Sequence, residues 1–143
     1  MNVSGVKALV FDVFGTVVDW RSSIIKHGEN FGRIHGVEAD WGAFADSWRS
    51  KYQPFMNRVR TGDLPWTNLD ALHRMALDDV LGEMGITGIS NEATAELNLA
   101  WHDLEPWGDS VPGLYRLKHR FIIAPLSNGN VALIVNMAKF SGL

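Results

Sequence analysis

The sequence of 143 residues contains no cysteine, which excludes a disulfide framework and thiolate chemistry. It also lacks a long apolar segment, because runs such as residues 121–126 are far shorter than the roughly 20 residues that cross a bilayer. Residues 1–5 show no basic segment followed by an apolar one, the pattern of a secretory signal peptide. These absences favour a cytoplasmic protein with no membrane partner.

The sequence has no excess of basic residues either. Its 13 Lys and Arg stand against 16 Asp and Glu, which gives a formal net charge of −3. Because non-specific nucleic-acid binding needs a basic surface, we expect no nucleic-acid partner. Hydrophobic residues make up 46% of the chain, enough for one compact domain with a core.

Two continuous apolar runs with β-branched residues, 8–12 and 121–126, predict buried parallel strands. Helices are expected over residues 20–35, 41–60, 68–84, 91–104, 112–119 and 130–140. Pro54 should kink or interrupt the second helix, since proline removes a backbone hydrogen bond. Thr67 and Asp70 resemble a capping box that opens the third helix.

This order of elements predicts an α/β fold with a Rossmann-like parallel-sheet core and an all-helical cap inserted after the first strand. We assign residues 1–18 and 111–143 to the core and residues 19–110 to the cap. Two parallel strands do not form a stable sheet alone, and another strand is expected after the last helix. The core is therefore incomplete in these residues, and we interpret them as an N-terminal portion of a larger protein.

Asp12 is the first candidate for chemistry, because ligands of open α/β sheets bind at the carboxyl ends of strands. Beside the turn at Gly15, its carboxylate could act as a nucleophile, a general base or a metal ligand, with Thr16 to orient it. The alternative is an aspartate that forms a turn or caps a helix.

The end of the second predicted strand, Leu126-Ser127-Asn128-Gly129-Asn130, is the second candidate. Hydroxyl and amide groups next to free helix N-terminal N–H groups make an anion site. Ser and Asn are also favoured at helix starts for structural reasons alone. The strand-end position of Asp12 favours the interpretation as an anion site, because the two motifs are expected to meet at the same edge of the sheet.

Together the two motifs resemble those of the haloacid dehalogenase-like hydrolase superfamily. The pattern Phe11-Asp12-Val13-Phe14-Gly15-Thr16-Val17-Val18-Asp19-Trp20 is similar to the first motif of the type II (L-2-) haloacid dehalogenases, and Leu126-Ser127-Asn128-Gly129 to the second. Trp48-Arg49-Ser50-Lys51-Tyr52 resembles the cap-helix motif of that subfamily.

The resemblance implies hydrolysis of short 2-haloalkanoic acids to 2-hydroxy acids. Asp12 would displace the halide and form an ester that water then hydrolyses, while Thr16 orients Asp12. Arg49 and Asn128 would stabilise the halide, and Ser127 with the backbone at Val13 and Phe14 would hold the substrate. For Arg49 the alternative is a surface residue of an amphipathic helix, the usual place of an arginine.

Phe14 bears on the choice of reaction. Phosphatases of this superfamily usually carry an acid there, which protonates a departing alcohol, whereas a halide is a weak base and needs no proton. Phe14 therefore favours a dehalogenase over a phosphomonoesterase, but leaves a phosphonate hydrolase open. The remaining alternatives are a Mg-dependent phosphatase and a catalytically incomplete fragment.

Further expectations concern aromatics, histidines and partners. Trp20 and Trp66 are candidates to line the substrate pocket, with cap–core packing as the alternative. The five histidines show no metal-ligand spacing and are expected at the surface or at helix ends. The resemblance implies no metal and no cofactor, a 2-haloacid substrate, a released halide and a homodimer. The family's third and fourth motifs, a Lys and an acidic loop, are not found in the sequence.

Overall fold

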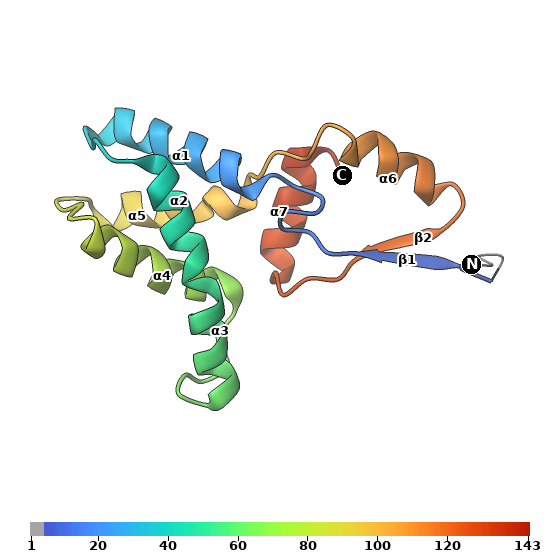
Figure 1. Ribbon diagram of the computed structural model, residues 1–143, viewed down its shortest axis with the longest axis horizontal. Helices are drawn as coiled ribbons and strands as arrows, with labels where there is room; N and C mark the ends of the chain where they lie inside the picture. The colour runs from blue at the N-terminus through green and yellow to red at the C-terminus, as the bar shows by residue number, and fades with distance from the viewer. Residues whose placement is uncertain (1–4) are drawn as a thin grey trace.

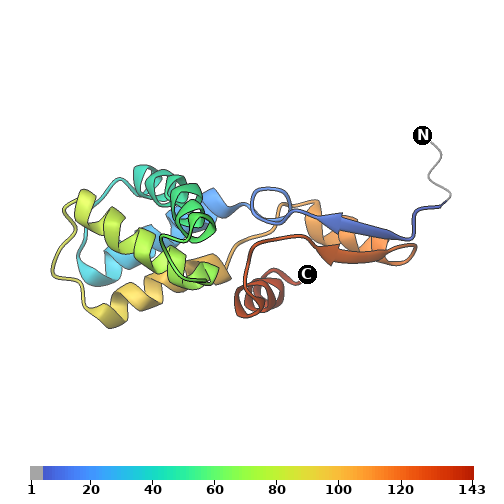
Figure 2. The same ribbon diagram turned by 90° about the horizontal axis from the view of Figure 1, so that it is seen from below.

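The structure is a computed structural model and describes residues 5–143. A group of helices, α1 to α5, lies at one end of an elongated molecule, and a short sheet flanked by α6 and α7 lies at the other (Figures 1 and 2). The chain passes from the sheet into the helical group after β1 and returns before α6 (Figure 1). Among the described residues, no helix has both the length and the hydropathy to span a membrane.

The elements agree with the α/β prediction. In chain order they are β1 (Ala8–Phe11), α1 (Trp20–His35), α2 (Trp41–Ser50), α3 (Tyr52–Thr61), α4 (Leu69–Glu83), α5 (Asn91–Asn98), the 3-10 helix η1 (Leu99–His102), α6 (Ser110–Lys118), β2 (Ile122–Pro125) and α7 (Val131–Ser141). The helices α1 to η1 lie within residues 19–110, the segment assigned to the cap. The domain boundaries themselves stay a prediction.

β1 and β2 pair in parallel, from Ala8 opposite Ile122 to Phe11 opposite Pro125, which confirms the predicted pairing. The prediction that these strands are buried is wrong for the described residues: Val10 is 62% and Ile122 70% exposed. A two-stranded sheet flanked by α6 and α7 leaves apolar side chains with nothing to pack against. Strand composition therefore predicted the pairing and not the burial.

One local feature of the helices confirms the prediction and another corrects it. The segment 41–60 forms two helices that meet at Lys51, the interruption expected of Pro54, which has no N–H to donate to the carbonyl of Ser50. Helix α4 is capped by Asn68 rather than by Thr67, with Asn68 Oδ1 accepting from the Ala71 N–H at 3.0 Å. The Thr67 hydroxyl instead donates to the carbonyl of Pro65 at 2.8 Å, so it is not available to cap.

The core of the helical part is built on large aromatic side chains. Trp41, Phe44 and Trp48 follow one another edge to face along α2, with ring centroids 5.2 and 5.5 Å apart. Trp48 continues to Trp101 of η1 at 5.5 Å, again edge to face. Such pairs add to the free energy gained by burying their apolar area. The cluster thereby joins α2 to η1.

Glycine at position 28 lets α1 approach Trp41. A Cβ at Gly28 would lie 2.4 Å from Trp41 Cε3, far inside van der Waals contact. Gly82, in α4, has open space around its Cα. These two helical glycines therefore differ in surroundings but not in the backbone freedom they lose on folding.

We predict opposite effects of alanine at these positions. Gly28→Ala should lower the free energy of unfolding by about 1–3 kcal/mol, because the added methyl displaces Trp41. Gly82→Ala, the matched control, should raise it by up to about 1 kcal/mol through helix propensity. Urea unfolding followed by tryptophan fluorescence measures both, and equal stability of the two variants would contradict the packing between α1 and Trp41.

Candidate functional site

The site is built around Asp12, the first residue after β1. Gly15, at φ +94°, allows the following loop to turn back, and the N–H groups of Thr16 and Val17 donate to the carbonyl of Val13. The turn brings the Thr16 hydroxyl to 2.8 Å from Asp12 Oδ2. Thr16 therefore holds the Asp12 carboxylate, as the sequence predicted.

The second motif reaches Asp12 by an extension of the strand pairing. Beyond the last paired residues, the Leu126 N–H donates to the carbonyl of Phe11 at 2.8 Å. Ser127 and Asn128 follow at once and line a cavity of about 300 Å³ together with Asp12. The Ser127 hydroxyl also accepts from the Gly129 N–H at 3.1 Å, which closes a tight turn.

The helical part contributes Arg49 to the same cavity. Its guanidinium carbon lies 4.6 Å from the centre of the Tyr52 ring and 5.7 Å from that of Trp20, so aromatic faces stabilise the cation. The Asn128 amide donates to the Tyr52 hydroxyl at 2.7 Å. Tyr52 thus connects the arginine to the second motif. The sequence placed it in the cap-helix motif and gave it no role in the site.

The rest of the wall is mostly apolar. Phe14 meets Trp101 edge to face at 6.1 Å, and Trp101 stacks on His73 at 4.4 Å. Of these apolar lining residues the sequence named Phe14, and Leu126 as part of the second motif. The lining residues that it missed as part of the site are Tyr52, Leu69, His73 and Trp101. Tyr52 stands beside Arg49 in the cap-helix motif, which could have indicated it, whereas no spacing in the sequence links His73 or Trp101 to Asp12.

The expectation that the histidines lie at the surface or at helix ends is wrong for His73 and incomplete for His102. They are 6% and 5% exposed. His73 falls on the buried face of α4 together with Leu69, Leu72 and Ala76. Burial, and then the positive charge of Arg49, lower the pKa of His73 to about 3. His73 is therefore neutral at physiological pH, and Arg49 is the positively charged side chain among those that line the cavity.

The structure does not bring Trp66 or the Val13 side chain into the cavity. Trp66 lies between α3 and α4 and is 84% exposed, because the loop that carries it projects from the helices. Val13 is 4% exposed and faces an apolar hollow between α6 and α7 instead. Within residues 5–143, no three His, Cys, Asp or Glu side chains gather as a metal site would need.

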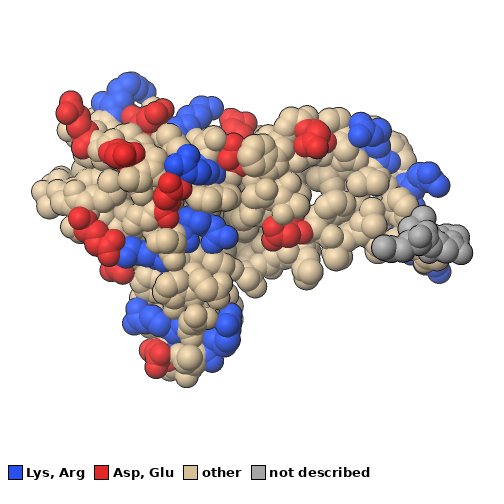
Figure 3. All heavy atoms as spheres, in the orientation of Figure 1, with Lys and Arg blue, Asp and Glu red and all other residues tan. Residues whose placement is uncertain are grey.

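The assembled groups combine a carboxylate with side chains that can bind an anion. A carboxylate held by Thr16 faces a cavity that also contains a guanidinium, an amide and a hydroxyl. The Phe14 and Trp101 rings form an apolar part of its wall, and electrostatic interactions are stronger beside such low-dielectric surfaces. On the face shown in Figure 3, by contrast, basic and acidic side chains are interspersed over much of the helical part, with basic ones gathered around α3. The cavity can therefore hold an anionic group close to the Asp12 carboxylate.

No protein family profile matches the sequence. It is 29% identical over 126 residues to (S)-2-haloacid dehalogenase 1 of Pseudomonas sp. (strain CBS-3), an alignment that covers 87% of this chain. The structure superposes on the crystal structure of the defluorinating L-2-haloacid dehalogenase Rha0230 with a TM-score of 0.92 and 49% identity over 96% of this chain. It superposes on the L-2-haloacid dehalogenase PA0810 with a TM-score of 0.89 and 42% identity over 97% of this chain.

The chain spans only part of the length of these relatives. It covers 52% of the Pseudomonas enzyme, 57% of Rha0230 and 59% of PA0810. The fold and the arrangement of the two motifs can therefore be compared over these residues alone.

We predict that His73 makes the protein less stable in acid. The unfolded chain takes up a proton on His73 below pH 6.5 while the folded chain does not until about pH 3, so folding becomes less favourable between these values. The loss should be about 1.4 kcal/mol per pH unit. In His73→Leu, the unfolding free energy should fall by about 2 kcal/mol less than in the wild type between pH 7.5 and pH 5. Equal losses, measured by urea unfolding at each pH, would show that His73 is protonated when folded.

Proposed function

We propose that this chain, whose fold is that of the L-2-haloacid dehalogenases, carries the nucleophile and the halide site of a hydrolytic 2-haloacid dehalogenase. The observation that supports this most directly is the shared cavity. Asp12, fixed by Thr16, lies in one cavity of about 300 Å³ with Arg49 and Asn128, and the wall beside it is Phe14 rather than an acid. This arrangement suits a leaving group that departs as an anion and needs no proton.

The reaction would begin with attack by Asp12. One carboxylate oxygen forms a bond to carbon 2 of the haloacid as the carbon–halogen bond breaks, and the electron pair leaves with the halide. Water then adds to the carbonyl carbon of the Asp12 ester. The ester opens to release a 2-hydroxy acid and one proton, and the Asp12 carboxylate is restored. The hydrogen bond from Thr16 engages one oxygen of Asp12 and leaves the other for attack.

Arg49 and Asn128 would take the leaving halide. Both line the cavity, and the Tyr52 hydroxyl, which contacts Asn128, keeps the amide beside the ring over which Arg49 lies. Ser127 and the backbone of the loop after Asp12 would take the substrate carboxylate. A cavity of about 300 Å³ suits haloacids of two or three carbons, and the relationship to a defluorinating enzyme makes fluoroacetate a substrate to include. A homodimer and a cytoplasmic location stay predictions.

The first test replaces the nucleophile. The full-length protein should release halide from 2-chloropropionate, and Asp12→Asn should abolish that release, because an amide oxygen is a poor nucleophile. A single turnover in heavy-oxygen water should place the label in Asp12. Halide electrode readings and mass spectrometry of the Asp12 peptide measure the two effects. Halide release by Asp12→Asn at the wild-type rate, or label in the product alone, would refute the ester.

The second test separates the charge of Arg49 from its shape. Arg49→Lys keeps a positive charge but loses the planar guanidinium that lies over the Tyr52 ring. We therefore expect kcat/KM for 2-chloropropionate to fall about 100-fold. Arg58→Lys, on α3, is the matched control and should change nothing, because Arg58 lies outside the cavity. Unchanged kcat/KM in Arg49→Lys would contradict a halide site that depends on the guanidinium of Arg49.

A further inference from the structure

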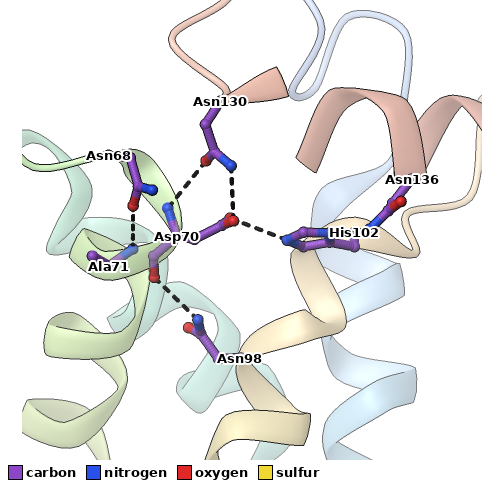
Figure 4. Close-up of polar contacts among 7 residues, drawn as sticks. All are labelled: Asn68, Asp70, Ala71, Asn98, His102, Asn130 and Asn136. Carbon is purple, nitrogen blue, oxygen red and sulfur yellow. Dashed lines mark hydrogen bonds and ion pairs between the residues drawn. The ribbon is translucent and has the colours of Figure 1, made fainter. Parts of the chain in front are cut away.

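Behind the cavity wall, Asp70 of α4 joins the second motif to the helical part (Figure 4). Asn130 Nδ2 donates to Asp70 Oδ2 at 2.8 Å, and Asn130 Oδ1 accepts from the Asp70 N–H at 3.3 Å. His102 Nε2 lies 3.1 Å from the other carboxylate oxygen, Asp70 Oδ1. Asp70 thus has polar partners on both sides of its carboxylate.

Asp70, His102 and Asn130 each lie within two residues of a residue that lines the cavity. Asp70 follows Leu69 in the chain, His102 follows Trp101, and Asn130 comes two residues after Asn128. Three separate segments of the cavity wall therefore meet at Asp70. The Asp70 side chain is 28% exposed and that of His102 is 7% exposed, so water competes little for these contacts.

Asn130 makes this contact instead of a local one. It stands at the N-cap of α7, where asparagine normally accepts a hydrogen bond from its own helix, yet its side chain makes no such bond. Its oxygen instead accepts from the first turn of α4, which Asn68 already caps. The Asn130 side chain therefore connects the second motif to α4 instead of capping α7.

A second layer of contacts fixes the orientation of the network. Asn98 Nδ2 donates to the Asp70 carbonyl at 3.0 Å. Asn136 Nδ2 lies 3.0 Å from His102 Nδ1. If Asn136 donates there, His102 carries its proton on Nε2 and donates it to Asp70. Asp70 then accepts from both Asn130 and His102, and its carboxylate has one favoured position.

We propose that Asp70 is a positioning residue for the reaction: through Asn130 it holds the Ser127–Asn128 segment at the distance from Asp12 that the substrate requires. The catalytic part of this proposal rests on the proposed function. Asp70 does not line the cavity and touches no reacting atom, so its effect on rate acts through Asn128. Small displacements of such groups lower rates strongly, because the reacting atoms lose their alignment.

Exchanging the side chains of Asp70 and Asn130 tests the contact between them. Asn130→Asp alone places a second carboxylate against Asp70, and kcat/KM should fall about 100-fold, mostly in kcat. Adding Asp70→Asn restores a donor opposite an acceptor, and the double variant should recover to within about threefold of the wild type. Asp79→Asn, an exposed change of the same kind on α4, is the matched control and should have no effect. A folded double variant as slow as Asn130→Asp would overturn the proposal.

A second measurement needs no turnover. The backbone amide signals of Ser127 and Asn128 in NMR spectra of the unliganded protein should shift in Asn130→Asp and return in the double variant. If Asn130→Asp does not fold, Asp70→Asn alone should shift the same two signals by a smaller amount. Should the wild type release no halide while the signals behave in this way, the proposed function fails and the positioning role stands. Unmoved signals would overturn the positioning role whatever the activity.

Discussion

The parallel pairing of β1 with β2 is the contact on which the site depends. It continues past the strands through the hydrogen bond from Leu126 to Phe11, so both chains leave the sheet at the same edge. This pairing brings Asp12 close to the Ser127–Asn128 segment, although they are more than 100 residues apart in the sequence. A shift of the register by one residue would move every side chain to the other face and separate the two motifs.

A second constraint fixes the helical part over that edge. The aromatic contact of Trp48 with Trp101 joins α2 to η1, and both helices contribute to the cavity, through Arg49 and Trp101. Polar contacts then bridge the helices and the second motif: Asn128 with Tyr52, and Asn130 with Asp70. Apolar packing supplies the stability of this arrangement, whereas directional hydrogen bonds determine where the polar groups of the site stand.

Much of this arrangement could be predicted from the sequence, where local chemistry decides the outcome. The bounds of α1, the interruption before Pro54 and the bond from Thr16 to Asp12 follow from residues close together in the chain. The role of Asn130 could not be predicted, because at a helix start its side chain has a good local partner and its actual partner is 60 residues away. Burial of His73 escaped prediction for a related reason, since it depends on Trp101 covering the ring.

Phe14 and Trp101 together form an apolar part of the cavity wall near Asp12. Phe14 packs edge to face on Trp101, which is 2% exposed. Phe14 has no group that could donate a proton, unlike an acid at that position, which suits the proposed departure of the halide as an anion. Because His73 is neutral as well, Arg49 supplies the positive charge of the lining side chains. In the proposed reaction the ring at position 14 supplies no proton, and Arg49 stabilises the halide that departs as an anion.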